Sequence, residues 1–336
     1  MSTPPLALFT DLTDLSIEPA KRILAEHGFR SEVLEVDASG VVATHQREAV
    51  ALIVGYRQLT ADLLAQFGSL GIIGTTSNGF DMIDLDHARE RGIWVTNVGH
   101  AATEEVAVHT MSLILAAERH LGAMQHIARE GGWTTEVTLT PRRLSTLTLG
   151  IVGFGKIGQA VAELAKPFFA SVIVHDPSQT GVLGEVTALP LDEVVAGSDV
   201  LSLHLPLTAE THHIIDAKAL ASMRPGATLV NVSRGELVDE TALLEALDTE
   251  RLSAACFDVL DTEPPSPQHP MRTHPRVLLT PHVAFLSSGS LTQYEETAAL
   301  RIAEWHENGS PSEWVLRGAE HSPMTKTLHD AHSKEQ

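Results

Sequence analysis

A glycine-rich stretch near the middle of the chain constrains its fold more than any other feature. Gly153, Gly155 and Gly158 have the spacing Gly-x-Gly-x-x-Gly. An apolar run from Thr148 to Val152 precedes them and predicts a buried parallel strand, and a helical pattern from Gln159 to Lys166 follows them. A strand, a glycine loop and a helix in this order predict a dinucleotide-binding fold, in preference to an ordinary glycine-rich turn.

Each glycine has a separate role in such a loop. Gly153 allows the tight turn from strand to helix, Gly155 allows a pyrophosphate to approach the backbone, and Gly158 allows the helix to pack closely on the strand. The N-terminus of the helix adds unpaired N–H groups and the positive end of the helix dipole. The stretch is therefore a candidate phosphate-binding site.

An acid at the end of the next strand indicates the cofactor. The apolar run from Ser171 to His175 ends at Asp176, which can accept hydrogen bonds from both ribose hydroxyls and would repel a 2′-phosphate. No basic residue follows to invite a phosphate, because Pro177 and Ser178 come next. The sequence therefore predicts NAD in preference to NADP.

Composition limits the class of protein. The 336 residues suggest two domains, and the net charge of −20 argues against nucleic acid or an anionic membrane as a partner. Cys256 is the only cysteine, which excludes an internal disulfide and fits a reducing compartment. The sequence has no apolar run of membrane-spanning length, no signal peptide pattern and no histidine spacing typical of a metal site. We therefore expect a cytoplasmic protein without a metal.

Strands and helices alternate over the first third of the chain, which predicts a parallel sheet with helices on its faces. The predicted strands are Leu6–Thr10, Val33–Val36, Leu52–Val54, Ile72–Thr75 and Trp94–Asn97, and the predicted helices are Pro19–His27, Ala61–Phe67 and Leu85–Arg91. A polar turn from Thr75 to Asp81 follows one strand, at the end where open α/β sheets bind ligands. An ordinary turn that caps the next helix is the alternative.

The alternation resumes after Asp176, so the glycine loop belongs to a second α/β domain. Further strands are predicted at Asp199–Leu203, Thr228–Val232, Ser253–Val259 and Val277–Leu279, with a helix at Asp239–Leu247. Two long helical patterns, Thr103–Leu121 and Ser290–Glu307, bound this segment. We therefore predict two doubly wound domains. A dinucleotide-binding domain of residues 102–283 is inserted into a domain made of residues 1–101 and 284–317, and residues 318–336 form a disordered tail.

Three ionisable residues follow three successive strands of the inserted domain: Arg234, Glu263 and His282. The carboxyl ends of parallel strands share one edge of the sheet, so these side chains should converge there. An Arg fork can hold a carboxylate, a His can protonate a carbonyl oxygen, and a carboxylate can keep that His protonated near neutral pH. This set is what hydride transfer to a 2-keto acid requires. A surface Arg at a helix start, a turn acid and a packed loop His are the alternatives.

The chain resembles the NAD-dependent D-isomer-specific 2-hydroxyacid dehydrogenases from residue 5 to residue 317. The matching stretches are Leu149–Gly158, His204–Thr208 through Thr211, Asn231–Gly235, Asp258–Pro264 and Thr280–His282. The resemblance implies a Rossmann-type NAD domain inserted into a flavodoxin-like substrate domain, and a homodimer joined through the NAD domain. It also implies a small 2-keto or 2-hydroxy acid as substrate.

The resemblance further implies a role for each matching residue. Arg234 is implied as the substrate carboxylate clamp, Glu263 and His282 as the acid–base pair, and Asn78 and Gly79 as backbone donors to the carboxylate. Besides the three glycines and Asp176, the implied cofactor contacts are Val106, Lys156, Ile157, Pro206, Thr211, Val232 and Asp258. From its position after the strand, Asp258 can also accept from the nicotinamide carboxamide.

Three departures from the family pattern concern the substrate. Residues 283–287 replace the glycine or tryptophan and threonine that many members have after the histidine, and we expect Phe285 to line the substrate pocket and to favour an apolar substituent. Val108 stands where many members have glutamate. Residues 97–105 are similar to the C-terminal binding protein corepressors, which share the fold.

Other functions are therefore possible for such a chain. An NAD-sensing dimeric binding protein like the corepressors is one alternative, although the set of Arg234, Glu263 and His282 favours an enzyme. A phosphite dehydrogenase has the same three residues, whereas a formate dehydrogenase has glutamine where Glu263 stands. A phosphoglycerate dehydrogenase would need more basic residues than Arg57 near the substrate loop.

Overall fold

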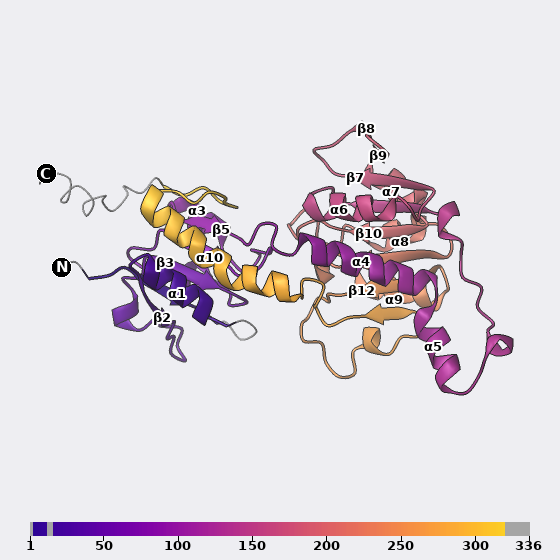
Figure 1. Cartoon of the computed structure of the whole chain (residues 1–336), viewed down its shortest axis with the longest axis horizontal. Coiled ribbons are helices and arrows are strands. Elements are labelled where there is room, and N and C mark those ends of the chain that lie inside the picture. The colour runs from indigo at the N-terminus through magenta and orange to yellow at the C-terminus, as the bar shows by residue number, and fades with distance from the viewer. Residues whose placement is uncertain (1–2, 12–15, 320–336) are drawn as a thin grey trace, which may run out of the picture. The chain divides into compact units, whose positions relative to one another are not determined.

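The computed structural model of the chain describes residues 3–11 and 16–319. It divides into two compact units, here called unit 1 (Met1–Ala101 with Ser287–Gln336) and unit 2 (Ala102–Leu286) (Figure 1). The chain returns to unit 1 at Ser287 and not at the predicted 284. The reason is local: Val283 and Ala284 donate their backbone N–H groups to the carboxylate of Asp258, at 3.0 and 2.8 Å, which holds them in unit 2.

Unit 1 is built on a five-stranded parallel sheet of order β2-β1-β3-β4-β5. The strands are β1 (Leu6–Phe9), β2 (Arg30–Val33), β3 (Ala51–Val54), β4 (Ile72–Thr75) and β5 (Trp94–Thr96). Alternate residues of each strand face opposite sides. Ala7 and Phe9 pack with helices α1 (Glu18–Glu26) and α10 (Ser288–Asn308), whereas Leu6 and Leu8 pack with α2 (Ala61–Leu64) and α3 (Leu85–Glu90).

Two predictions for unit 1 need correction. The second strand covers Arg30–Val33 and not Val33–Val36, because it is a half-exposed edge strand without an apolar run, while Val36 forms an isolated bridge with Val42. The predicted tail begins too early. The N–H of Ala319 donates to the carbonyl of Gly92 and the indole N–H of Trp94 donates to the carbonyl of Ala319, both at 2.8 Å. The rest of that tail lies outside the described residues.

Unit 2 contains an eight-stranded sheet of order β13-β12-β11-β10-β6-β7-β9-β8, parallel except for the β8–β9 hairpin. The strands are β6 (Thr148–Val152), β7 (Ser171–His175), β8 (Gly181–Leu183), β9 (Val186–Ala188), β10 (Val200–Leu203), β11 (Ala227–Asn231), β12 (Leu252–Phe257) and β13 (Val277–Leu279). The strand order reverses between β6 and β10, which is where open α/β sheets bind ligands. The predicted α/β class with parallel sheets is confirmed.

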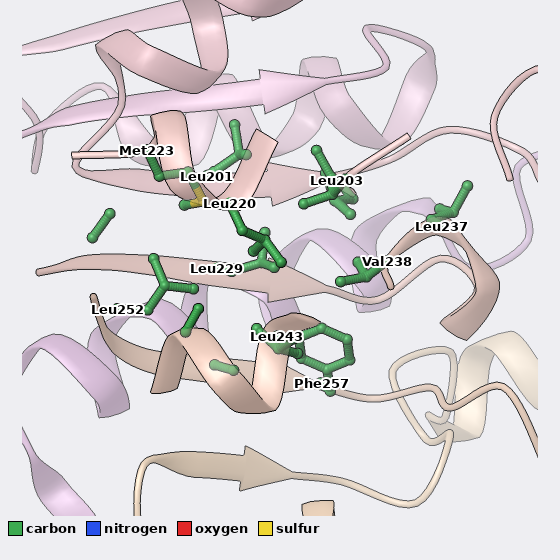
Figure 2. Packing of buried hydrophobic residues seen from close by; sticks show 14 of the residues in the cluster. Leu201, Leu203, Leu220, Met223, Leu229, Leu237, Val238, Leu243, Leu252 and Phe257 are labelled. Atoms are coloured by element: carbon green, nitrogen blue, oxygen red, sulfur yellow. The ribbon is translucent and has the colours of Figure 1, made fainter. Parts of the chain in front are cut away.

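Helices cover both faces of this sheet. One core joins the sheet to α7 (Leu191–Gly197), α8 (Ala217–Ser222) and α9 (Glu240–Asp248); it includes Leu201, Leu203, Leu229 and Phe257 among its fully buried side chains (Figure 2). The other core joins the sheet to α4 (Thr103–Glu118) and α6 (Lys156–Ala165). The helix α5 (Leu121–Arg129), which the sequence analysis missed, has no buried residue.

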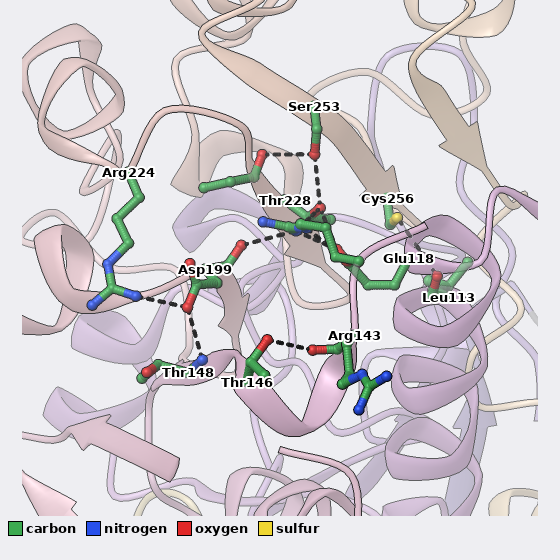
Figure 3. Close-up of polar contacts among 12 residues, drawn as sticks. Leu113, Glu118, Arg143, Thr146, Thr148, Asp199, Arg224, Thr228, Ser253 and Cys256 are labelled. Atoms are coloured by element: carbon green, nitrogen blue, oxygen red, sulfur yellow. Dashed lines mark hydrogen bonds and ion pairs between the residues drawn. The ribbon is translucent and has the colours of Figure 1, made fainter. Parts of the chain in front are cut away.

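A buried charge fixes the end of α4 to the sheet. Glu118 is 3% exposed, and its carboxylate accepts hydrogen bonds from the Arg142 guanidinium, at 2.6 and 3.0 Å, and from the Thr228 hydroxyl, at 2.7 Å. Figure 3 shows Glu118 and Thr228 in this network, with Asp199 beside them. A buried charge that is paired in this way specifies one position of α4 against the first residues of β11.

Within the described ranges, none of the helices combines the length and the apolar character that a bilayer crossing requires.

Candidate cofactor site and active site

The glycine loop is the point of closest packing in unit 2. Gly153 follows β6 with a φ of 91°, and a Cβ atom there would lie 2.2 Å from the carbonyl oxygen of His204. A Cβ atom on Gly158 would lie 2.2 Å from the carbonyl oxygen of Gly153. Any larger residue at either position would force the loop away from β10 or from α6. Glycine at these positions therefore brings the start of α6 against the carboxyl ends of β6 and β10.

Gly155 differs from its two neighbours because the space in front of it is open. A Cβ atom there would meet no atom within 4 Å. Gly155 is the N-cap residue of α6, and Lys156 and Ile157 form the first turn of that ten-residue helix. An open space in front of a glycine at a helix N-terminus is suited to a phosphate group. The residues here fit the pyrophosphate of a dinucleotide.

Asp176 is held at the edge of this loop. One carboxylate oxygen accepts the N–H of Phe154 at 2.9 Å, and the other accepts the N–H and the hydroxyl of Ser178 at 2.9 and 2.6 Å. Burial raises the pKa of the Asp176 carboxyl, but these hydrogen bonds outweigh it and lower the pKa below its usual value. A negative charge therefore stands beside the glycine loop at neutral pH.

The loop that follows β10 is closed by its own side chains. The hydroxyl of Thr211 donates to the carbonyl of Pro206 at 2.8 Å and accepts the N–H of Thr208 at 2.7 Å. His204 begins this loop. Burial lowers the pKa of His204 to about 3, and its Nε2 lies 2.8 Å from the Ser202 hydroxyl, so the imidazole is neutral near pH 7. The structure thus brings Pro206 and Thr211 together, and their cofactor contacts stay a prediction.

Arg234 follows β11 in a loop that Asn231 shapes. The Asn231 amide donates to the carbonyl of Arg234 at 2.7 Å, and its oxygen accepts the N–H of Ser233 at 3.0 Å. Asn231 is fully buried. The sequence analysis included Asn231 in a matching stretch but assigned it no role, although a polar residue that ends a buried strand was an available signal. Asn231 therefore positions Arg234.

Glu263 and His282 form a hydrogen-bonded pair. The Nδ1 of His282 lies 2.5 Å from one oxygen of Glu263, and the other oxygen accepts the N–H of Leu260 at 2.8 Å. Burial raises the pKa of Glu263, but the His282 and Leu260 hydrogen bonds and the charge of Arg234 outweigh it and lower the pKa. Glu263 is therefore ionised. Because it engages Nδ1, the Nε2 atom is the nitrogen that a substrate could meet.

Four further predicted residues, namely Val106, Val232, Asp258 and Phe285, also lie in unit 2. Val232 packs in the apolar cluster that contains Phe154 and Ile157, and Val106 is buried in α4. The ring centroid of Phe285 lies 6.4 Å from that of His282, in an edge-on arrangement. The carboxylate of Asp258 is 1% exposed and contacts the backbone after His282. Its predicted cofactor contact stays a prediction.

Asn78 and Gly79 belong to unit 1, in the loop after β4. The carbonyl of Asn78 accepts from the Asn97 amide at 3.0 Å, and the carbonyl of Gly79 accepts from the Ser77 hydroxyl at 2.8 Å. Within residues 3–11 and 16–319, the N–H groups of Asn78 and Gly79 have no acceptor. The loop is therefore fixed through its carbonyls and leaves two donors for a ligand.

Within residues 3–11 and 16–319, no three His, Cys, Asp or Glu side chains come together in a way that could hold a metal ion.

Comparison with known proteins identifies similar chains. Residues 111–284 match the model for the D-isomer specific 2-hydroxyacid dehydrogenase, NAD binding domain. The chain is 37% identical over 284 residues to the glyoxylate reductase of Aeropyrum pernix. The aligned region covers 81% of this chain and 84% of that protein.

Two solved structures are similar in fold over most of both chains. A glyoxylate/hydroxypyruvate reductase of Sinorhizobium meliloti, in complex with NADP and malonate, is 31% identical with a TM-score of 0.82, covering 94% of this chain and 97% of that one. A D-lactate dehydrogenase of Aquifex aeolicus, complexed with NAD and lactic acid, is 29% identical with a TM-score of 0.79, covering 89% of this chain and 95% of that one.

The open space at Gly155 leads to a first prediction. Gly155 has φ −70° and ψ −163°, which alanine can adopt, so Gly155→Ala should leave the melting temperature unchanged or slightly higher. The added methyl would occupy the space for the pyrophosphate, and NADH affinity should fall by at least about tenfold. Fluorescence titration and thermal denaturation measure the two effects.

Gly122→Ala is the matched control, because a Cβ atom at Gly122 in α5 would also meet no atom within 4 Å. It should leave NADH affinity unchanged. Wild-type affinity in Gly155→Ala would show that the dinucleotide does not approach this glycine.

Proposed function

The chain belongs to the D-isomer-specific 2-hydroxyacid dehydrogenases, and we propose that it interconverts a 2-keto acid and a D-2-hydroxy acid with Glu263 and His282 as its acid–base pair and Arg234 as its carboxylate clamp. That it is a dehydrogenase of this class follows from its family, and the roles of the residues are the proposal. The 2.5 Å contact between His282 and Glu263, with Arg234 close enough to lower the pKa of that glutamate, carries it.

The three side chains divide the work of reduction. NADH, when bound, supplies the hydride that the carbonyl carbon accepts. Arg234 presents a planar fork of donors that holds the carboxylate of the keto acid and orients its carbonyl. His282 donates a proton from Nε2 to the carbonyl oxygen as charge develops there. Glu263 holds Nδ1 and supplies the negative charge that favours the imidazolium form.

The pH dependence of the reaction follows from this arrangement. Reduction of the keto acid consumes a proton and oxidation of the hydroxy acid releases one, so reduction should slow and oxidation should speed up as pH rises. Because the pKa of Glu263 is lowered, its charge persists across this range and is lost only under acidic conditions. Reduction should therefore also slow under acidic conditions in which Glu263 takes up a proton.

Substitution of the pair tests the proposal. His282→Ala should lower kcat by about 10² to 10⁴, the usual effect of one positioned proton donor. Glu263→Gln removes the charge but keeps a hydrogen-bonding group, so kcat for reduction should fall and the loss of activity under acidic conditions that comes from protonation of Glu263 should disappear. Steady-state rates of NADH oxidation with a panel of 2-keto acids, across pH, measure both.

Arg234→Lys is the companion variant. It keeps the positive charge but loses the fork, so KM for the keto acid should rise while NADH affinity stays near wild type. Near-normal turnover in His282→Ala would contradict the assigned mechanism. If wild type binds NADH but reduces no keto acid, a corepressor-like binding function becomes the better explanation. Phosphite oxidation by wild type would favour a phosphite dehydrogenase.

Substrate size is a finer part of the proposal. The relatives include a glyoxylate reductase and a D-lactate dehydrogenase, and we infer a small 2-keto acid here. The edge-on Phe285 beside His282 favours an apolar substituent at carbon 2. The two unpaired N–H groups of Asn78 and Gly79 support a role in carboxylate binding. A reducing, cytoplasmic location fits the single buried Cys256.

Cofactor preference rests on Asp176. Its ionised carboxylate beside the glycine loop would repel a 2′-phosphate, so kcat/KM should favour NADH over NADPH by at least about tenfold. Asp176→Asn keeps an acceptor for the Phe154 N–H but lacks the charge, and should narrow the preference. Equal kcat/KM for the two cofactors in wild type would contradict this assignment. The comparison is needed because a similar protein, the reductase of Sinorhizobium meliloti, was solved with NADP.

We also propose a homodimer joined through unit 2. Three large apolar side chains are exposed on or near α5, namely Leu121 (54%), Trp133 (76%) and Leu139 (43%). In Figure 1, α5 extends away from the body of unit 2. A helix without buried residues is rarely stable alone in water, so a second copy of the same surface is a suitable partner.

Light scattering of a surface variant tests the dimer. Trp133→Ser should shift the protein toward monomer, because it removes the most exposed large apolar side chain of this segment. Val182→Ser is the matched control, since Val182 is 75% exposed on β8, another part of unit 2. A wild-type protein that is monomeric at micromolar concentration would contradict the proposal.

A further inference from the structure

The backbone of His282 is held on both sides by one buried residue. His282 has a φ of 54°, in the left-handed region that non-glycine residues seldom adopt. Its N–H donates to the backbone carbonyl of Asp258 at 2.8 Å. The carboxylate of Asp258 accepts the N–H groups of the next two residues, Val283 at 3.0 Å and Ala284 at 2.8 Å. The left-handed conformation of His282 therefore depends on Asp258.

Two further side chains lie against the same carboxylate, one from the start of this loop and one from α4. The hydroxyl of Thr280 donates to Asp258 at 2.5 Å. The Nε2 of His109, on α4, lies 3.1 Å from the Thr280 oxygen and 3.6 Å from the nearer Asp258 oxygen. Because Thr280 gives its only proton to Asp258, its oxygen must accept from His109. Nε2 of His109 therefore carries a proton, and the order of donation is His109, Thr280, Asp258.

This chain of hydrogen bonds connects α4 to the proton donor. Asp258 is 1% exposed, so its orientation depends on the donors of the protein around it. Val283 and Ala284 fix it from the loop side, and Thr280 and His109 fix it from the other. The sequence analysis compared Val108 with the family and assigned nothing to His109. The His109 side chain is 23% exposed and lies against the buried carboxylate of Asp258. An ordinary surface residue of a helix would point into the solvent instead.

We propose that His109 is a positioning residue for the reaction, which holds Asp258 through Thr280 and so keeps His282 aligned with Glu263. This inference rests on the proposed role of His282 as the proton donor. His109 does not need to contact substrate or cofactor for this role. Loss of His109 removes the donor that fixes the Thr280 hydroxyl on Asp258, which loosens the backbone at His282 and weakens the 2.5 Å contact with Glu263.

Kinetics of His109→Ala should show a selective loss. We expect kcat to fall by about tenfold, the effect of one lost hydrogen bond in an aligned site, with KM for the keto acid and NADH affinity within about twofold of wild type. The 2.5 Å contact between His282 and Glu263 should also weaken. A purely structural role of His109 would lower stability and leave this contact intact.

Three variants make this result specific. His109→Gln places an amide nitrogen near the position of Nε2 and should restore most of kcat. Thr280→Val removes the intermediate hydroxyl, so the double variant with His109→Ala should lose little beyond either single variant. Ser112→Ala is the matched control on α4, because the Ser112 hydroxyl donates to Val108 of its own helix, and it should behave as wild type.

A spectroscopic measurement separates this inference from the proposed reaction. The short hydrogen bond between His282 and Glu263 should give a downfield imidazole N–H proton signal, assigned by its loss in His282→Ala. In His109→Ala the signal should broaden or disappear, whether or not a substrate is known. An unchanged signal together with unchanged kcat would overturn the role of His109. Failure of wild type to reduce any keto acid, with the signal lost in His109→Ala, would overturn the reaction and leave the positioning role standing.

Discussion

Close backbone approach at the carboxyl edge of β6 is the constraint on which unit 2 depends. Two glycines allow the carbonyl of His204, the loop at Gly153 and the start of α6 to meet without an intervening side chain. The same approach sets the position of β10 beside β6, and hence the reversal of strand order between them. Every residue proposed for chemistry in unit 2 stands on the edge that this packing defines.

Much of this arrangement could be predicted from sequence because it follows from strand ends. The glycine loop, Asp176 and the three residues Arg234, Glu263 and His282 each follow a buried apolar run, and parallel strands bring such ends together. The short hydrogen bond between Glu263 and His282 agrees with that reasoning, while their roles stay a prediction until variants are measured. The five matching stretches, in their order along the chain, gave the resemblance to the family.

Other features could not be predicted, because their signals are tertiary. The edge strand Arg30–Val33 is polar and half-exposed, so periodicity placed the strand three residues late. The β8–β9 hairpin is too short for an alternating pattern to register. Asn231 and His109 act through hydrogen bonds to segments distant in sequence. A polar residue at the end of a buried strand, such as Asn231, indicates a hydrogen bond that shapes the following loop.

The late arrival of α10 has a consequence for synthesis on the ribosome. One face of the unit 1 sheet is covered by Ala298, Ile302 and Trp305 of α10, whereas its strands are complete by Thr96. All of unit 2 is translated between the two. The sheet of unit 1 therefore lacks part of its apolar cover until unit 2 has been translated, and transiently exposed apolar surface of this kind is prone to aggregation.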